Sequence, residues 1–162
     1  MKFVIIGAGP AGVRAAETLR ENDPQATITL VGDEPGEPYA RMAIPYILSG
    51  AIDDGGARQR RSLDHLQALG IRYLHGKALK VQARPAGGQV DLADGTQLPY
   101  DRLLVATGSS PSLPPLTGTG LPGVATCWTL EDAHRIAAKL VPGARVVMLG
   151  AGFVAGVCMK SL

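Results

Sequence analysis

Short runs of consecutive apolar residues are the main feature of the hydrophobic pattern along this chain. The first is Phe3–Ile6, which is rich in β-branched side chains and is typical of a parallel strand covered by helices on both faces. A helix is expected next, from about Ala11 to Asn22. Its apolar residues share one face: Val13, Ala16 and Leu19. Its charged residues face elsewhere: Arg14, Glu17 and Glu21.

Later apolar runs continue this order of strand and helix. Further parallel strands are expected at Thr27–Val31, Ile71–Leu74 and Arg102–Ala106. Two or three shorter strands are expected before the last of these, at Ala78–Ala83, Gln89–Leu92 and Thr96–Leu98, with a hairpin turn at Asp94-Gly95. These elements predict an α/β fold in which a small antiparallel meander is inserted between the strands of a parallel sheet.

The segment between the second and third parallel strands is expected to hold short helices and loops. A short helix is predicted at Ile44–Ser49, followed by a polar, mobile stretch from Ile52 to Arg61. Ser62 is expected to cap a helix that runs to about Leu69 and is closed by Gly70.

The last part of the chain begins with a connection rich in proline and glycine, residues 109–123. Thr129 and Asp132 form a T-x-x-D capping pattern for a helix over Leu130–Leu140. A strand is then predicted at Arg145–Leu149, followed by a second glycine-rich turn. The chain therefore repeats, near its end, the strand and turn with which it begins.

The first glycine-rich turn, Gly7-Ala8-Gly9-Pro10-Ala11-Gly12, has the spacing that binds a dinucleotide. Gly7 permits the tight turn, Gly9 leaves room for a pyrophosphate, and Gly12 lets the helix pack closely on the strand. The amino end of the helix offers unpaired N–H groups and a partial positive charge. Asp33 follows Gly12 by 21 residues, close to the spacing at which an acidic side chain reaches a ribose. A glycine loop unrelated to any ligand is the alternative, but the combination of elements favours a dinucleotide.

Composition narrows the class of protein. The 162 residues suffice for one domain and little more, and a net charge of +2 with 4% aromatic residues gives no sign of a nucleic-acid partner. The basic run Arg58–Arg61 is expected to be a solvated loop.

The apolar run Val146–Met159 has 14 residues, fewer than the roughly 20 that cross a bilayer, so no membrane segment is expected. Cys127 and Cys158 are far apart in the sequence and are expected to form neither a metal site nor a dithiol, which favours a cytoplasmic protein.

Four motifs together resemble the FAD- and NAD(P)-dependent pyridine nucleotide–disulfide oxidoreductase superfamily, in the branch of ferredoxin and rubredoxin reductases and apoptosis-inducing-factor-like proteins. They are Gly7–Gly12, Val31–Pro35 with Pro38–Arg41, Ala106–Gly108, and Leu149–Val154. The resemblance covers essentially the whole chain. It implies a Rossmann-like FAD-binding domain at residues 1–123, with a parallel sheet, helices on both faces and a small antiparallel meander. A connecting segment and helix at 124–143 and the first strand and helix of a second Rossmann unit at 144–162 would follow.

The resemblance also implies which residues hold the cofactors. The backbone of the first turn would bind the FAD pyrophosphate, at Gly7, Gly9, Pro10, Ala11 and Gly12. Asp33 and Glu34 would accept hydrogen bonds from the adenosine ribose, and the guanidinium of Arg41 would lie along the phosphates. The main chain of Ala78 would meet the adenine. The cofactor would pass beside Ala106, Thr107 and Gly108, for which a simple strand-end turn is the alternative. Gly150 and Gly152 would repeat the turn for NAD(P)H.

Some positions depart from the family pattern. Met42–Pro45 stands where members that store electrons on sulfur have cysteine, so no thiol relay is expected there, and Tyr46 stands where a lysine often contacts the flavin. Trp128 replaces an arginine that often contacts FAD, and it is expected to stack on the flavin or, more typically for an indole, to pack between domains. No catalytic residue and no metal ligand are predicted, because the histidines lack ligand spacing and a paired nucleophile: His65, His75 and His134.

The intact design implied by the resemblance is an FAD-dependent NAD(P)H oxidoreductase. Hydride would pass from NAD(P)H to FAD, and electrons then to a small acceptor or an electron-carrier protein. The chain stops before the second strand of the NAD(P) unit and lacks the Gly-Asp strand of the family, so we expect an N-terminal portion that binds FAD weakly or not at all and does not turn over NADH. A non-enzymatic FAD- or nucleotide-binding subunit completed by another chain is the alternative. A stand-alone NAD dehydrogenase is disfavoured by the meander and by Ala106-Thr107-Gly108.

Overall fold

The computed structural model describes residues 1–59 and 63–161. The chain forms two compact units, of which the first comprises Met1–Tyr39 and Arg58–Gly108 and the second Ala40–Ala57 and Ser109–Leu162. Ser62, which is expected to cap a helix, and the end of the basic run that precedes it lie outside the described residues.

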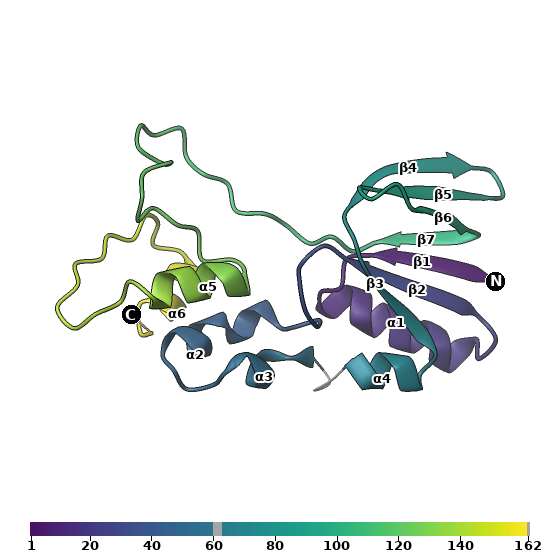
Figure 1. Ribbon diagram of the computed structural model, residues 1–162, viewed down its shortest axis with the longest axis horizontal. Helices are drawn as coiled ribbons and strands as arrows, with labels where there is room; N and C mark the ends of the chain where they lie inside the picture. The colour runs from purple at the N-terminus through teal and green to yellow at the C-terminus, as the bar shows by residue number, and fades with distance from the viewer. Residues whose placement is uncertain (60–62, 162) are drawn as a thin grey trace. The chain divides into compact units, whose positions relative to one another are not determined.

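A four-stranded parallel sheet forms the centre of the first unit (Figure 1). Its strands lie in the order β3 (Ile71–His75), β2 (Thr27–Gly32), β1 (Lys2–Ile6) and β7 (Arg102–Val105). The register pairs Val4 with Thr29 on one side and with Leu103 on the other. Because all the strands run the same way, the loops that follow them leave the sheet at the same edge.

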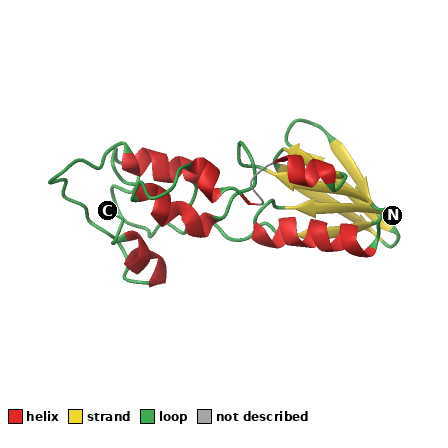
Figure 2. Cartoon of the chain, turned by 90° about the horizontal axis from the view of Figure 1, so that it is seen from below, coloured by secondary structure: helices red, strands yellow, loops and turns green. Residues whose placement is uncertain are grey.

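The alternation of side chains along β1 divides the core between the two faces of this sheet. Ile5 packs with residues of α1 (Pro10–Asn22) and α4 (Leu63–Ala68), among them Val13, Ala16 and Leu66. Val4 and Ile6 pack on the opposite face with residues of the antiparallel strands, among them Val90, Leu92 and Leu98. In Figure 2 both helices lie in front of the strands. The second face, which the sequence predicts to lie under helices, is thus covered by a second sheet, whose apolar side chains bury it equally well.

The antiparallel sheet confirms the predicted meander. Its strands are β4 (Ala78–Arg84), β5 (Gly87–Leu92) and β6 (Gln97–Tyr100), in that order. At the predicted hairpin, Gly95 has a φ of 86° and the Leu92 N–H donates to the Thr96 carbonyl at 2.9 Å.

Glu17 is buried in α1, although the helical pattern places it with the residues that face away from the core. His65 Nε2 of α4 lies 2.9 Å from Glu17 Oε1, and Arg14 Nη1 lies 3.3 Å from Glu17 Oε2. These two polar partners offset the cost of removing this carboxylate from water.

The second unit is helical. Its elements are η1 (Arg41–Ala43), α2 (Ile44–Leu48), α3 (Asp54–Ala57), α5 (Leu130–Ala137) and α6 (Phe153–Cys158), and α2 contacts both α5 and α6. Helix α3 replaces part of the predicted mobile stretch, and His134 Nε2 lies 2.8 Å from Asp54 Oδ1 there.

The predicted capping box opens α5, since the Asp132 N–H donates to Thr129 Oγ1 at 3.0 Å and the Thr129 N–H donates to Asp132 Oδ2 at 3.1 Å. The helix ends at Ala137, earlier than predicted.

The prediction of a strand at Arg145–Leu149 is wrong, because the structure has no strand there. Val147 is 91% exposed and Leu149 is 73% exposed. A strand forms only where neighbouring strands pair with its N–H and C=O groups, and in the part of the second unit that the structure describes no strand is present to do so. The turn after it keeps the expected geometry, because Gly150 has a φ of 101° and α6 begins after Gly152.

Candidate functional site

The turn between β1 and α1 is held by backbone contacts that require glycine at two positions. The Gly7 N–H donates to the Val31 carbonyl at 2.8 Å. Gly7 has a φ of 111°, and a Cβ atom there would lie 2.2 Å from the carbonyl oxygen of Ala106. A Cβ atom at Gly12 would lie 1.8 Å from the carbonyl oxygen of Gly7. Both glycines are therefore needed by the fold itself.

Gly9 is not required by the fold in this way. Its φ of −72° suits any residue, and a Cβ atom there would meet nothing within 4 Å. Among the described residues, the N–H groups of Gly9, Ala11 and Gly12 have no acceptor, as expected for the first turn of a helix. Pro10, which has no N–H, occupies the first helical turn without loss. A glycine with room for a side chain, in a turn whose N–H groups have no acceptor, fits an anion that closely approaches the backbone.

The carboxyl end of β2 lies beside this turn. A Cβ atom at Gly32 would lie 2.8 Å from the Cβ atom of Ala8, and the acidic residues Asp33 and Glu34 follow directly. The Gly76 N–H, in the connection between β3 and β4, donates to the Gly32 carbonyl at 2.8 Å. Donors for an anion and carboxylates for hydroxyl groups therefore stand at one edge of the sheet, as a nucleotide diphosphate requires.

Two tyrosines surround the acidic pair. The Tyr39 hydroxyl donates to the Glu34 carboxylate, and the Tyr73 hydroxyl donates to the Gly36 carbonyl at 3.4 Å. Burial, and then the nearby Asp33 and Glu34 carboxylates, raise the pKa of Tyr73, so its hydroxyl stays protonated. Asp33 is exposed. Tyr73 is not among the residues predicted for the site, although an aromatic residue on the strand next to an acidic strand end is a signal for it.

The third of the four motifs, Ala106–Gly108, crosses the first glycine-rich turn. The Ala106 N–H donates to the Ile6 carbonyl at 2.7 Å, and the backbone of Ala106 and Thr107 lies against Gly7. Gly108 then turns away from the strand with a φ of 68°. Ala78 begins β4, is half-buried and pairs with Leu92. The structure therefore brings the first turn, the acidic strand end and the third motif together within the first unit.

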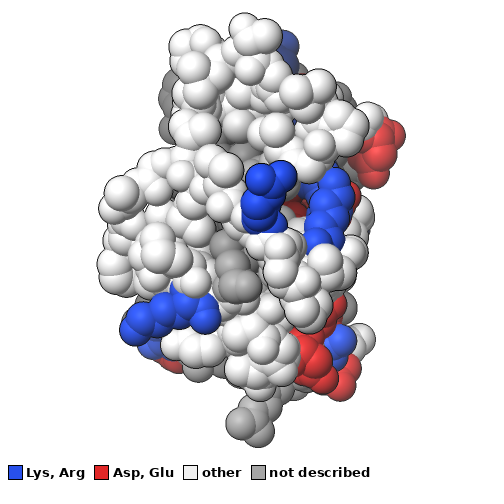
Figure 3. All heavy atoms as spheres, turned by 90° about the vertical axis from the view of Figure 1, so that its left-hand side faces the viewer, with Lys and Arg blue, Asp and Glu red and all other residues white. Residues whose placement is uncertain are grey.

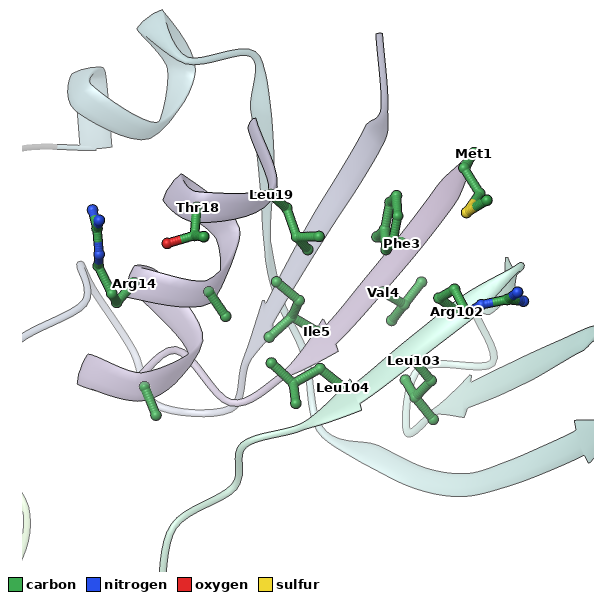
Figure 4. Close-up of a pocket in the computed structure, with 12 residues that line it drawn as sticks. Met1, Phe3, Val4, Ile5, Arg14, Thr18, Leu19, Arg102, Leu103 and Leu104 are labelled. Carbon is green, nitrogen blue, oxygen red and sulfur yellow. The ribbon is translucent and has the colours of Figure 1, made fainter. Parts of the chain in front are cut away.

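An apolar groove runs between α1 and β7 (Figure 4); its lining includes Ala11 of the first turn but neither Gly9 nor Asp33. Its lining is mostly apolar and includes Phe3, Leu19, Leu103 and Leu104, with the side chains of Arg14 and Arg102 beside them. β7 is the last strand of the parallel sheet among the described residues, and its Val105 is 60% exposed. The groove thus accompanies an open edge of the sheet.

The remaining predicted cofactor residues lie in the second unit. Arg41 contacts Trp128, whose carbonyl accepts from Arg41 Nη1 at 2.6 Å. Gly150 and Gly152 are exposed, and a Cβ atom at either would meet nothing within 4 Å. Their roles toward a cofactor stay predictions.

Cys127 and Cys158 lie side by side, so the expectation that they form no dithiol is wrong. Their Sγ atoms are 3.7 Å apart, and both are free thiols. Proximity across the fold, between the segment before α5 and the end of α6, cannot be read from their separation in the sequence.

Charge and hydropathy add little to this picture. On the face shown in Figure 3, the Lys and Arg side chains are scattered and do not form a continuous basic surface. The described helices include none whose length and apolar character would allow it to span a membrane. Within the same residues, no three potential metal ligands gather.

Comparisons with known proteins agree with the motifs. A family model described as pyridine nucleotide-disulphide oxidoreductase matches residues 1–159. The chain is 36% identical over 154 residues to the rhodocoxin reductase of Rhodococcus erythropolis. It is 37% identical over 156 residues to the ferredoxin–NAD(+) reductase component of the anthranilate 1,2-dioxygenase system of Burkholderia cepacia. These matches cover 95% and 94% of this chain, but 36% and 37% of the two relatives.

Solved structures show the same relationship. A covalent complex of putidaredoxin reductase with putidaredoxin matches with a TM-score of 0.85 at 31% identity, over 99% of this chain and 40% of that chain. An NAD-dependent persulfide reductase from A. fulgidus matches with a TM-score of 0.86 at 29% identity, over 99% of this chain and 32% of that chain. The chain thus spans between 32% and 40% of the length of these four proteins.

Proposed function

The chain belongs to the pyridine nucleotide-disulphide oxidoreductase family, and we propose that it forms the FAD-binding part of an NAD(P)H-dependent oxidoreductase. Members of the family use FAD and NAD(P)H. When bound, these cofactors supply the redox chemistry, a hydride transfer from nicotinamide to flavin followed by electron transfer to an acceptor. The residues of this chain bind and orient the flavin nucleotide.

The open space at Gly9 carries this proposal. Glycine at a position where the protein itself leaves room for a side chain is explained if a ligand fills that room. The N–H groups of Gly9, Ala11 and Gly12, which have no acceptor among the described residues, belong to the same turn and suit the oxygens of a pyrophosphate. Gly7 and Gly12, by contrast, are explained by contacts within the protein.

The rest of the proposed site follows the sheet edge. Asp33 accepts hydrogen bonds from the ribose, and Glu34, which Tyr39 orients, supports it. The main chain of Ala78 meets the adenine, and Ala106–Gly108 lines the path of the cofactor. In the second unit, Arg41 serves the phosphates, and Gly150 and Gly152 belong to the turn for NAD(P)H. Residues 1–123 then belong to the FAD domain, 124–143 to the connection and 144–162 to the NAD(P) domain.

Titration with FAD tests the proposal. The wild-type chain, Gly9→Ala and Gly120→Ala are titrated by equilibrium dialysis. Gly120 is a matched control because its Cβ atom would also meet nothing within 4 Å and it has no left-handed φ. We expect weak but saturable binding, which Gly9→Ala weakens by a further factor of about ten or more, equivalent to about 1.4 kcal/mol, and which Gly120→Ala leaves unchanged. Equal affinity of Gly9→Ala and the wild type would overturn the proposal.

The acceptor is proposed to be an electron-carrier protein or a small molecule. The putidaredoxin complex among the matching structures and the ferredoxin–NAD(+) reductase relative support the first choice. A cytoplasmic location is part of the proposal and is supported by the two free thiols.

A second candidate is a nucleotide-binding subunit that another chain completes. The open edge of β7 and the apolar groove beside it favour this candidate, because both offer a place for a further strand and its covering element. Purification from the native source tests it: a stoichiometric partner that pairs with β7 would support it, whereas an NADH-active single chain would exclude it.

A further inference from the structure

Two thiols meet inside the second unit without belonging to the proposed nucleotide site. Cys127 Sγ and Cys158 Sγ are 3.7 Å apart, within van der Waals contact of one another. Cys158 is buried, Cys127 is half-buried, and both are reduced.

Both cysteines are held by folded elements. Cys127 lies two residues before Thr129, the N-cap of α5, and the segment around it is fixed by Asp132. That carboxylate accepts from Thr126 Oγ1, the Trp128 N–H and the Thr129 N–H at 3.0–3.1 Å. Cys158 is the last residue of α6, and α2 contacts both helices. The two sulfurs are therefore neighbours because of the fold.

The geometry needs only a small adjustment to form a covalent bond. A disulfide has an S–S distance of about 2.05 Å, so the sulfurs would have to approach by roughly 1.7 Å. Rotation about the two Cα–Cβ bonds supplies movements of this size.

We infer that Cys127 and Cys158 are a disulfide-forming pair, which a small-molecule disulfide such as glutathione disulfide converts into a cross-link between α6 and the segment that precedes α5. The Cys127 thiolate attacks the oxidant because it is the more accessible sulfur, and one glutathione leaves as the thiolate. The Cys158 thiol then loses its proton, and its sulfur attacks Cys127 Sγ, which releases the second glutathione. Two protein thiols are oxidised and one glutathione disulfide is reduced, so electrons and atoms balance.

The surroundings make this reaction slow at neutral pH. Burial, and then the neighbouring Cys158 sulfur and the Asp132 carboxylate, raise the pKa of Cys127 to about 12. Since the thiolate is the attacking species, the rate of oxidation increases with pH up to that value. The reduced form therefore persists unless the oxidant is abundant.

The cross-link has a structural consequence for the second glycine turn. Helix α6 begins after Gly152 and carries the exposed Phe153 and Val154 on its first turn. A bond at Cys158 fixes the other end of this helix to the base of α5. The oxidised form thus restrains α6 and the glycine turn that leads into it.

Equilibration in glutathione redox buffers tests the inference. The chain is equilibrated in these buffers both in its native state and in concentrated urea. Acid stops the thiol exchange, the remaining free thiols are alkylated, and the mass of the chain is measured by mass spectrometry. We expect an intramolecular disulfide, seen as the loss of two hydrogen atoms. The equilibrium constant for its formation from glutathione disulfide should be at least about tenfold larger in the native chain than in the chain unfolded by urea. Cys127→Ser and Cys158→Ser are the matched controls and are expected to stop at a single glutathione adduct or to stay reduced.

Two results would overturn the inference. One is an equal equilibrium constant in the native and the urea-unfolded chain, and the other is a stable glutathione adduct of the native chain with no internal disulfide. Trp128, the single tryptophan of the sequence, gives an independent readout because it lies next to Cys127. The fluorescence transition of the oxidised chain is expected about 5 °C above that of the reduced chain, and an unchanged or lower transition would also contradict the inference.

Discussion

Arg41 lies over the indole ring of Trp128, with its guanidinium carbon 5.1 Å from the ring centroid and its Nη1 donating to the Trp128 carbonyl at 2.6 Å. The two contacts join the start of η1 to the residue before the N-cap of α5. They fix a planar cation in one orientation.

Replacement of Arg41 is expected to loosen the tryptophan. Arg41→Lys keeps the charge but loses the planar fork, so the free energy of unfolding of the second unit should fall by about 1 kcal/mol. Trp128 should also become more accessible to acrylamide. Urea unfolding and quenching of the tryptophan fluorescence measure both effects. Arg145→Lys, an exposed position in the same unit, serves as the control, and an equal effect of the two variants would contradict the contact.

The two kinds of glycine in the first turn predict losses of stability of very different size. Gly12→Ala places a methyl group against the Gly7 carbonyl oxygen, so we expect a loss of about 3 kcal/mol or more. Gly9→Ala meets no protein atom and should cost less than about 1 kcal/mol, the loss of a glycine N-cap. Circular dichroism during urea unfolding measures both. Similar losses in the two variants would show that the turn differs from the one described.

Asp132 makes the stability of the second unit depend on acid pH. Burial alone raises the pKa of its carboxyl, but hydrogen bonds from Thr129, Arg135, Thr126 and Trp128 outweigh burial, and the net pKa is lowered. The stabilisation is therefore fully present above the unfolded pKa of about 3.9 and is lost as the pH falls through the lower folded value.

Asp132→Asn is expected to lower the free energy of unfolding at pH 7 by about 1–2 kcal/mol, because it removes the charge from the capping box. The difference from the wild type should shrink as the pH falls below about 4. Tryptophan fluorescence in urea at a series of pH values measures it. Glu131→Gln, on the exposed side of the same helical turn, should show a much smaller change. A pH-independent difference for Asp132→Asn would contradict the assignment.

The elements that the sequence predicts correctly are those whose signals are local. β1, the first turn, α1 and β2 follow from an apolar run, fixed glycine positions and helical periodicity, and all of them are present. The predicted capping box at Thr129 is present for the same reason. The spacing between Gly12 and Asp33 also correctly places an acidic residue at the strand end beside the turn.

The failures depend on partners distant in the sequence. Arg145–Leu149 has the composition of a strand but forms none, because a strand needs neighbours. Glu17 is buried with its carboxylate in contact with His65 and Arg14, and no helical pattern contains that information. The contact between Cys127 and Cys158 likewise arises from the packing of α5, α2 and α6.

The central claim is that the open space at Gly9 receives the phosphates of a nucleotide whose ribose lies near Asp33. The most direct measurement compares the binding of ADP and of adenosine to the wild type, Gly9→Ala and Asp33→Asn by calorimetry. ADP should bind the wild type more tightly than adenosine, Gly9→Ala should remove this advantage, and Asp33→Asn should weaken both ligands by a similar factor. An advantage of ADP that survives in Gly9→Ala would contradict the claim.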